Sequence, residues 1–360
     1  MIQRKEAALR SVTVLVVAAF AGVSSAVSCG SSASESTATS EASKSSEAPA
    51  TTAAAQSPTV AEDAVELFTL GGPDALPSVV AWSPDGTHLA TAIHGEANIW
   101  DASTGVKLNE QHIDHLRDVT AIEWSPDSIH TALIAESDSG IYEPLSGPEL
   151  LVPVPDFLAY SPDGTRIAVG GPWGWSAVID ATTGNEQLTL PSCPTWVYAA
   201  AWSPDGARIA TTCGSTVTIS DAATGEELHT LSQDAQAAGS TREATDVAWS
   251  PDGTRMAVIT GEPGTRDGIA AVWDVTIGEE MDAPEHTIGG VWAIAWSPDG
   301  TRVATVGADP AATVWDPTSG DQLISLAGHE ALVTDVAWSP DGTRVATADR
   351  DGTVKVWLVD

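Results

Sequence analysis

The chain has 360 residues, of which 42% are hydrophobic, and it carries 49 Asp and Glu residues against 15 Lys and Arg residues, a formal net charge of −34 at pH 7. That much apolar material is enough for a sizeable buried core. The negative charge argues against nucleic acid and anionic lipid surfaces as binding partners, because both repel such a field.

Residues 1–28 are predicted to be an export signal. Three basic residues stand among the first ten, and residues 11–27 contain no charge and are rich in Val and Ala. This uncharged segment is short for a membrane-spanning helix. It ends at Cys29 in a pattern that resembles the bacterial lipoprotein signal, in which the Cys receives a diacylglyceryl group. Ala26 stands where that family usually has Leu, so ordinary cleavage after Ala26 is the alternative.

Residues 29–62 are predicted to be the lipidated Cys29 and a disordered tether. After Cys29 the segment consists mostly of Ser, Ala, Thr and Glu and contains no aromatic residue. Such a composition cannot bury enough apolar surface to offset the entropy lost on ordering. We therefore expect an exported protein, anchored by lipid to the outer face of the bacterial cytoplasmic membrane, with residues 63–360 as its folded domain.

The folded domain is predicted to consist of seven repeats of about 42 residues, the usual length of a four-stranded propeller blade. The five-residue word WSPDG, or a close variant of it, recurs at spacings of 36 to 47 residues, starting at Trp82, Trp124, Tyr160, Trp202, Trp249, Trp296 and Trp338. Pro and Asp suit the two central positions of a type I turn, and Gly tolerates the positive φ that follows. Each word therefore predicts a hairpin between the first two strands of a blade.

The two ends of the domain are predicted to share one blade. The chain ends at Asp360, just after the third strand of the last repeat, which leaves that blade without an outer strand. Glu66–Leu70 matches the pattern of a fourth strand and precedes the first repeat. We expect it to pair beside Val354–Trp357, because this pairing would remove the exposed strand edges.

The last repeat combines Gly328-His329, the word at Trp338 and a closing Trp357, and it resembles a WD-40 repeat. The resemblance to the WD-repeat family covers about residues 64–360. It implies an all-β fold, a seven-bladed WD-repeat β-propeller whose ring is closed by the N-terminal outer strand. It also implies a hydrogen-bond network inside the last blade, made by His329, Thr347, Asp351 and Trp357.

The same resemblance bears on two of the three Cys residues. Cys193 stands nine residues before Trp202, as His329 stands nine before Trp338, and Cys213 falls near the position of the network Asp. Those two positions face each other in the family, and export permits disulfides. A Cys193–Cys213 disulfide is therefore implied, with two unpaired buried thiols as the alternative.

No catalytic constellation stands out in the sequence. It contains no Gly-x-Ser-x-Gly elbow, no HExxH and no phosphate loop, and no two of its eight His residues share metal-ligand spacing with nearby Cys or carboxylates. We expect no catalytic residue, no metal and no cofactor. The predicted function is a monomeric scaffold that binds a protein or peptide. The alternative is a propeller enzyme, lactonase-like or hydrolase-like, with its site in the central channel.

The partner is expected to bind the face formed by the turns between second and third strands and by the loops that enter the next blade. Aromatic and Arg side chains are typical anchors of protein interfaces. Those found in these connections are Trp173, Trp175, Trp196, Tyr198, Arg266, Trp292 and Arg350. For Trp175 and Trp292, packing between blades is the alternative.

Overall fold

The computed structural model describes residues 62–71, 79–93, 96–112, 119–135, 139–143, 147–152, 157–232, 242–261, 268–281 and 290–359. These residues form 29 β-strands and one short 3-10 helix, η1 (Pro172–Gly174). The all-β, propeller-like fold expected from the repeats is confirmed. Within these ranges no helix is long and apolar enough to cross a membrane. Cys29 and Arg266 lie outside the described residues.

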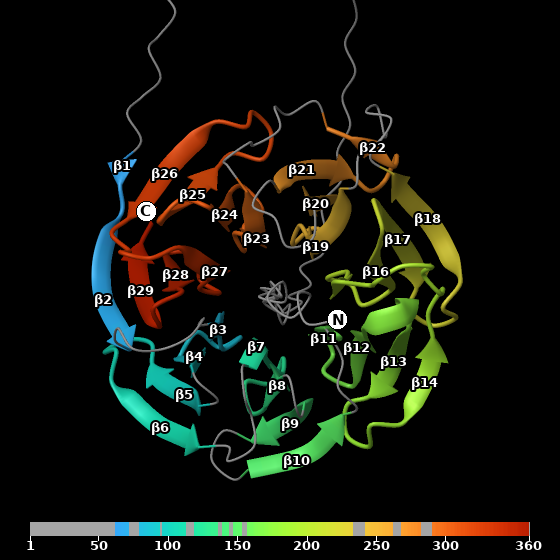
Figure 1. Ribbon diagram of the computed structural model, residues 1–360, viewed down its shortest axis with the longest axis horizontal. Helices are drawn as coiled ribbons and strands as arrows, with labels where there is room; N and C mark the ends of the chain where they lie inside the picture. The colour runs from blue at the N-terminus through green and yellow to red at the C-terminus, as the bar shows by residue number, and fades with distance from the viewer. Residues whose placement is uncertain are drawn as a thin grey trace, which may run out of the picture. The chain divides into compact units, whose positions relative to one another are not determined.

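The strands form seven sheets, five of which are plain four-stranded meanders (Figure 1). The first three are β3 (Val79–Trp82), β4 (His88–Ile93), β5 (Glu96–Asp101) and β6 (Lys107–His112); β7 (Val119–Trp124), β8 (Thr131–Ala135), β9 (Ser139–Glu143) and β10 (Gly147–Val152); and β11 (Phe157–Tyr160), β12 (Arg166–Gly170), β13 (Ser176–Asp180) and β14 (Glu186–Thr189). The next two are β15 (Ala200–Trp202), β16 (Arg208–Cys213), β17 (Thr216–Asp221) and β18 (Glu227–Ser232); and β19 (Glu243–Trp249), β20 (Arg255–Gly261), β21 (Ile269–Asp274) and β22 (Glu279–Glu280).

The last two sheets also take strands from the start of the domain. The sixth contains β23 (Val291–Trp296), β24 (Val303–Gly307), β25 (Ala311–Trp315) and β26 (Gln322–Ala327), with β1 (Glu62–Asp63) added parallel to β26. The seventh contains β27 (Val333–Trp338), β28 (Arg344–Asp349) and β29 (Thr353–Leu358), with β2 (Val65–Gly71) as its outer strand.

The WSPDG words form the hairpins between first and second strands. In the last sheet the Ser339 hydroxyl donates to Asp341 Oδ1 and accepts from the Arg344 amide, while Asp341 accepts from the Thr343 amide. Burial alone would raise the pKa of Asp341, but the hydrogen bonds from Ser339 and Thr343 outweigh it and lower the pKa. Equivalent Ser–Asp pairs recur in the other sheets. Seven of the acidic residues therefore stabilise the turns of these hairpins.

In each meander the connections alternate between two ends, since neighbouring strands are antiparallel. We call the end with the first-to-second and third-to-fourth turns the hairpin face. The loop face carries the second-to-third turns and the loops that lead into the next sheet. Asp205 and Ile277 lie in connections of the hairpin face, whereas Trp173 and Trp196 lie in connections of the loop face.

Adjacent sheets are joined by a repeated contact at the tryptophan of the word. Trp202 donates from Nε1 to the carbonyl of Ala159 in the preceding sheet, at 2.9 Å, and the guanidinium of Arg166 lies 4.6 Å from the centre of the Trp202 ring. The same Arg-on-Trp stacking occurs at Arg208–Trp249, Arg255–Trp296, Arg302–Trp338 and Arg344–Trp82. In these five joints the arginine that follows the hairpin turn thus covers the indole of the following sheet.

The joint between the second and third sheets lacks the Arg-on-Trp stacking and buries the acid Glu123. Glu123 precedes Trp124 in β7, at a position occupied by Ala in the other six repeats. Its side chain is buried, and both carboxyl oxygens lie 3.1–3.2 Å from the amide nitrogen of Tyr160 in the next sheet, which donates to them. Burial raises the pKa of Glu123 to about 8. The carboxyl is therefore mostly protonated at neutral pH.

The first and last parts of the domain meet along several strands. β2 pairs antiparallel with β29 from Val65–Leu358 to Gly71–Thr353 (Figure 1). Leu70 is buried in this contact. The first strand of each sheet contacts that of the next from β3 through β27, and β27 in turn contacts β3. There the amide of Val80 donates to Asp335 Oδ2 at 2.9 Å. The pairing expected for Glu66–Leu70 is present.

Candidate functional site

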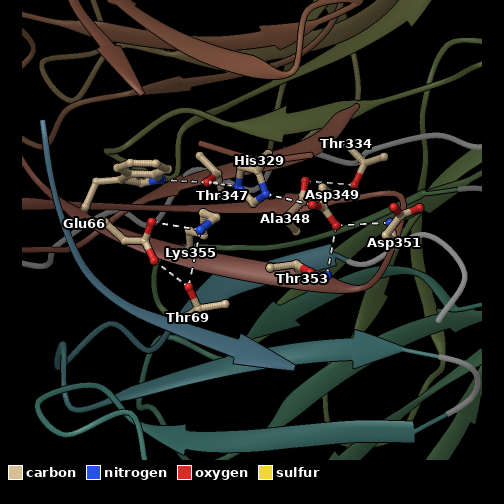
Figure 2. A network of polar contacts seen from close by, with 11 residues as sticks. Glu66, Thr69, His329, Thr334, Thr347, Ala348, Asp349, Asp351, Thr353 and Lys355 are labelled. Atoms are coloured by element: carbon tan, nitrogen blue, oxygen red, sulfur yellow. Dashed lines mark hydrogen bonds and ion pairs between the residues drawn. The ribbon is translucent and has the colours of Figure 1, made fainter. Parts of the chain in front are cut away.

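The most enzyme-like cluster among the described residues is a buried histidine network in the last sheet (Figure 2). His329 contacts Asp349 Oδ2 through Nδ1 at 2.8 Å and the Thr347 hydroxyl through Nε2 at 2.7 Å. Trp357 donates from Nε1 to the same hydroxyl, which holds β29 to β28. Burial lowers the pKa of His329 by more than Asp349 raises it, so the ring is neutral near pH 7.

The protons of this network are all used inside it. With the ring neutral, Nδ1–H donates to Asp349, and Nε2 accepts the proton of the Thr347 hydroxyl. That hydroxyl in turn accepts from the Trp357 indole. A network that is satisfied in this way rigidifies the sheet, and its members His329, Thr347 and Asp349 are all buried. The described residues contain no group of three or more His, Cys, Asp or Glu arranged to hold a metal ion.

The aspartate of the network is Asp349, and the prediction of Asp351 is wrong. Asp349 ends β28 two residues after Thr347, so the two side chains point to the same face of the strand. Asp351 lies beyond the strand in the turn and is exposed. The other oxygen of Asp349 accepts the backbone amides of Asp351 and Thr353, so one carboxylate orders both the histidine and the turn.

We expect Asp349→Asn to destabilise the protein by about 2 kcal/mol, because an amide cannot replace a carboxylate that accepts from three donors. Asp351→Asn is the matched control and should change stability by less than about 0.5 kcal/mol, as is usual for an exposed residue. Urea unfolding of both variants measures the difference. Equal losses of stability in the two variants would mean that Asp349 is not the aspartate that holds His329.

The loop face carries a cluster of exposed tryptophans. Trp173 is 88% exposed, and its ring centre lies 6.5 Å from that of Trp196, with the two planes inclined by 31°. Trp196 and Trp175 are each about two-fifths exposed. Trp173 also has a φ of 67°, a strained conformation for a bulky residue that costs roughly 1–3 kcal/mol. Burial in the core does not offset this strain, which indicates that the ring has a use at the surface.

The two loops that carry Trp173 and Trp196 are fixed to one another. The amide of Cys193 donates to the carbonyl of Gly174 at 3.2 Å. A side chain at Gly174 would collide with Cys193, since its Cβ would lie 1.6 Å from the Cys193 carbonyl oxygen. The Cys193–Cys213 disulfide is present, with a Cα–Cα distance of 5.6 Å, and ties this loop to the end of β16. The loops that carry the tryptophan pair are therefore held in place by a hydrogen bond between them and by a disulfide to β16.

The remaining expected contact residues divide into three groups. Tyr198 is buried, so its prediction as a partner contact is wrong: its amide donates to the Thr212 hydroxyl, which fastens the loop as it enters β15. Trp292 is half-buried and donates from Nε1 to the carbonyl of Val333 at 2.8 Å, which confirms the packing alternative. Arg350 is exposed in the turn between β28 and β29, on the loop face.

The family model described as "WD domain, G-beta repeat" matches residues 184–221, 225–274, 282–316 and 320–357. The last of these segments takes in β26 and then β27 to β29, so this matched unit begins with the fourth strand of one sheet and ends with the third strand of the next. The chain therefore contains four WD repeats. No curated protein matches its sequence. WD repeats in general point to a protein-interaction scaffold. Of the exposed tryptophan pair, Trp173 precedes the first of the four matched segments and Trp196 lies within it.

Proposed function

We propose that this WD-repeat protein is a scaffold that binds a protein or peptide partner on its loop face, at Trp173 and Trp196. The observation that carries the proposal is an exposed, strained Trp173 beside Trp196 on a disulfide-linked base. Aromatic side chains on rigid loops are the usual anchors of an interface, since they bury a large area at low entropy cost. Arg350 and Trp175 also lie in connections of this face.

We further propose that the seven sheets are the blades of one closed ring. Three contacts between its ends support closure: β2 pairs with β29, the Val80 amide donates to Asp335, and the Arg344 guanidinium lies 4.6 Å from the centre of the Trp82 ring. Arg344 also donates to the carbonyl of Ala102, in the first sheet. A closed ring would hold the loop face rigid, which favours a preformed binding surface.

The test of the scaffold is partner capture by cross-linking pull-down from the native membrane. We expect Trp173→Ala and Trp196→Ala each to weaken capture by about 2 kcal/mol or more, roughly 30-fold, because a buried aromatic anchor contributes that much. The melting temperature should stay nearly unchanged, since both rings are exposed.

Asp205→Ala is the control on the hairpin face. It removes the acceptor for the Ser203 hydroxyl and the Ala207 amide, so it should lower stability without weakening capture further. If both tryptophan substitutions lower the melting temperature as much as Trp202→Ala does, the two residues serve packing and the interface lies elsewhere.

We also propose that the scaffold is exported and tethered by a lipid on Cys29, which leaves the loop face accessible outside the cytoplasmic membrane. The basic start, the uncharged segment 11–27 and the small residues before Cys29 support this. Intact-mass analysis of membrane-fraction protein should give a chain that begins at Cys29 and carries a diacylglyceryl group. A chain that begins at Val27 without lipid mass would refute the anchor.

A further inference from the structure

The way this chain covers its own tryptophans indicates what a partner can place on the exposed pair. At five joints between sheets an arginine guanidinium lies over an indole ring, with 4.6–4.8 Å from the guanidinium carbon to the ring centre. The guanidinium is flat and weakly hydrated, so it stacks on an aromatic face at little desolvation cost. In these joints its N–H groups also reach backbone carbonyls, as Arg166 does at Ala222 and Arg208 at Gly253.

The pair on the loop face has the same chemistry but faces solvent. Trp173 exposes 88% of its surface and Trp196 exposes 40%. Their ring centres lie 6.5 Å apart and their planes are inclined by 31°. A planar group that stacks on the exposed part of these rings meets fixed loops, because Gly174 and the Cys193–Cys213 disulfide hold them in place.

The charge of the protein selects among planar groups. The formal net charge is −34, and such a field attracts cations and repels anions. An acidic segment would meet this repulsion, and a neutral apolar segment would gain nothing from the field. An arginine gains from both the field and the stacking, since its side chain is planar and always charged.

We propose that the Trp173–Trp196 pair binds an arginine side chain on a basic segment of the partner protein. This proposal rests on the proposed function and names the chemistry of the partner. The guanidinium stacks on the exposed indole faces, as Arg166 does on Trp202 inside the fold. Lysine is a weaker occupant because its ammonium group is compact, strongly hydrated and unable to lie flat on a ring.

The experiment is an NMR titration of the full-length mature protein that follows the indole N–H signals of Trp173 and Trp196, assigned from the Trp→Phe variants. The probe is the blocked pentapeptide Gly-Arg-Gly-Arg-Gly, and its control carries citrulline at both arginines, which keeps the shape and removes the charge. We expect the arginine peptide to shift both signals saturably. Affinity should fall at least tenfold in Trp173→Ala and in Trp196→Ala, and it should fall with added salt.

Two results would overturn the proposal. One is a citrulline peptide that shifts both signals with the same affinity as the arginine peptide. The other is an arginine peptide that binds the two alanine variants as well as it binds the wild type. Ile277→Ala, at an exposed apolar residue of the hairpin face, is the control that should change nothing.

The outcome separates this inference from the scaffold itself. Partner capture can depend on Trp173 and Trp196 while the arginine peptide neither binds the pair nor competes with the partner. In that case the scaffold proposal holds and the proposal of an arginine ligand is refuted. The occupant is then an apolar segment or a glycan. If capture is the same in both alanine variants, the proposed binding site is wrong.

Discussion

A chain that starts at residue 72 should fail to reach a stable fold, whereas a chain that starts at residue 61 should fold as the full protein does. The difference between the two is β1 and β2. β2 supplies the outer strand of the last sheet, and its Leu70, only 3% exposed, fills the gap between that sheet and the first. Without it, β29 presents an open edge that invites aggregation.

Three further contacts would be lost with these strands. β1 pairs with β26, so the same segment crosses from the sixth sheet to the seventh. Glu66 forms an ion pair with Lys355 at 2.8 Å, which Figure 2 shows beside the histidine network. Phe68 lies against Gly105 of the first sheet, where a Cβ would be 3.1 Å from its ring. Because these contacts are lost together with the strand pairing, we expect the free energy of unfolding to fall by at least about 5 kcal/mol, or the protein to aggregate outright.

Thermal unfolding and size-exclusion chromatography measure this loss. The control is a deletion of residues 33–55 from the predicted tether, which should leave the melting temperature unchanged. Equal melting temperatures for the chains that start at residues 61 and 72 would show that the N-terminal strands do not hold the fold together.

Glu123→Gln should stabilise the protein strongly in alkaline solution and much less in acid. The pKa of Glu123 is about 8 in the folded state against an ordinary value of 4.5. The folded protein therefore holds a proton between those two pH values that the unfolded chain has released. Stability falls as the pH rises through this window, because the buried carboxylate must either ionise or keep its proton at increasing cost.

The gap between the two pKa values corresponds to about 5 kcal/mol, an upper bound for the gain from the amide. Urea unfolding at about pH 5 and about pH 9 should show the advantage of Glu123→Gln growing by several kcal/mol between the two. Glu123→Ala should behave similarly, since six other repeats carry Ala at this position.

Titration of His329 changes stability with pH in the opposite direction from Glu123, but it does not affect the comparison of Glu123→Gln with the wild type. Its pKa is lowered in the folded state, so stability is lost as the pH falls below its ordinary value of 6.5. Both proteins share this effect, and it cancels in their difference. Glu226→Gln, at an exposed acid, should show the same small effect at both pH values. An advantage of Glu123→Gln that does not change with pH would mean that the carboxyl is ionised in the fold.

The repeat made the strands predictable, because the WSPDG word marks one hairpin per unit and β2 completes the pattern of the last. The prediction of Asp351 as the network aspartate was wrong because it rested on counting residues across a turn. Two aspartates stand near the end of β28, and only the alternation of side chains along the strand, with Thr347 facing inward, selects Asp349.

Contacts between repeats could not be read in the same way. Arg166 stacks on Trp202, 36 residues later, and nothing in the local pattern of either residue indicates the other. Glu123 differs in the sequence from the Ala of the other six repeats, but that difference does not show that the neighbouring sheet buries it. The loops have no period at all, so Tyr198 was predicted to face solvent, while the structure buries it and exposes Trp196 two residues earlier.

The most direct test of the scaffold is site-specific photocross-linking in the native cell from the two ends of β17. Ser215 lies exposed on the loop face, where its neighbour Gly214 approaches Thr195, and Ala223 lies exposed on the hairpin face of the same sheet. A photoreactive residue at 215 should yield a discrete protein adduct that disappears when Trp173 and Trp196 are both changed to Ala, and a photoreactive residue at 223 should yield none. An adduct from 223 alone, or one from 215 that persists without the two tryptophans, would contradict binding through the tryptophan pair.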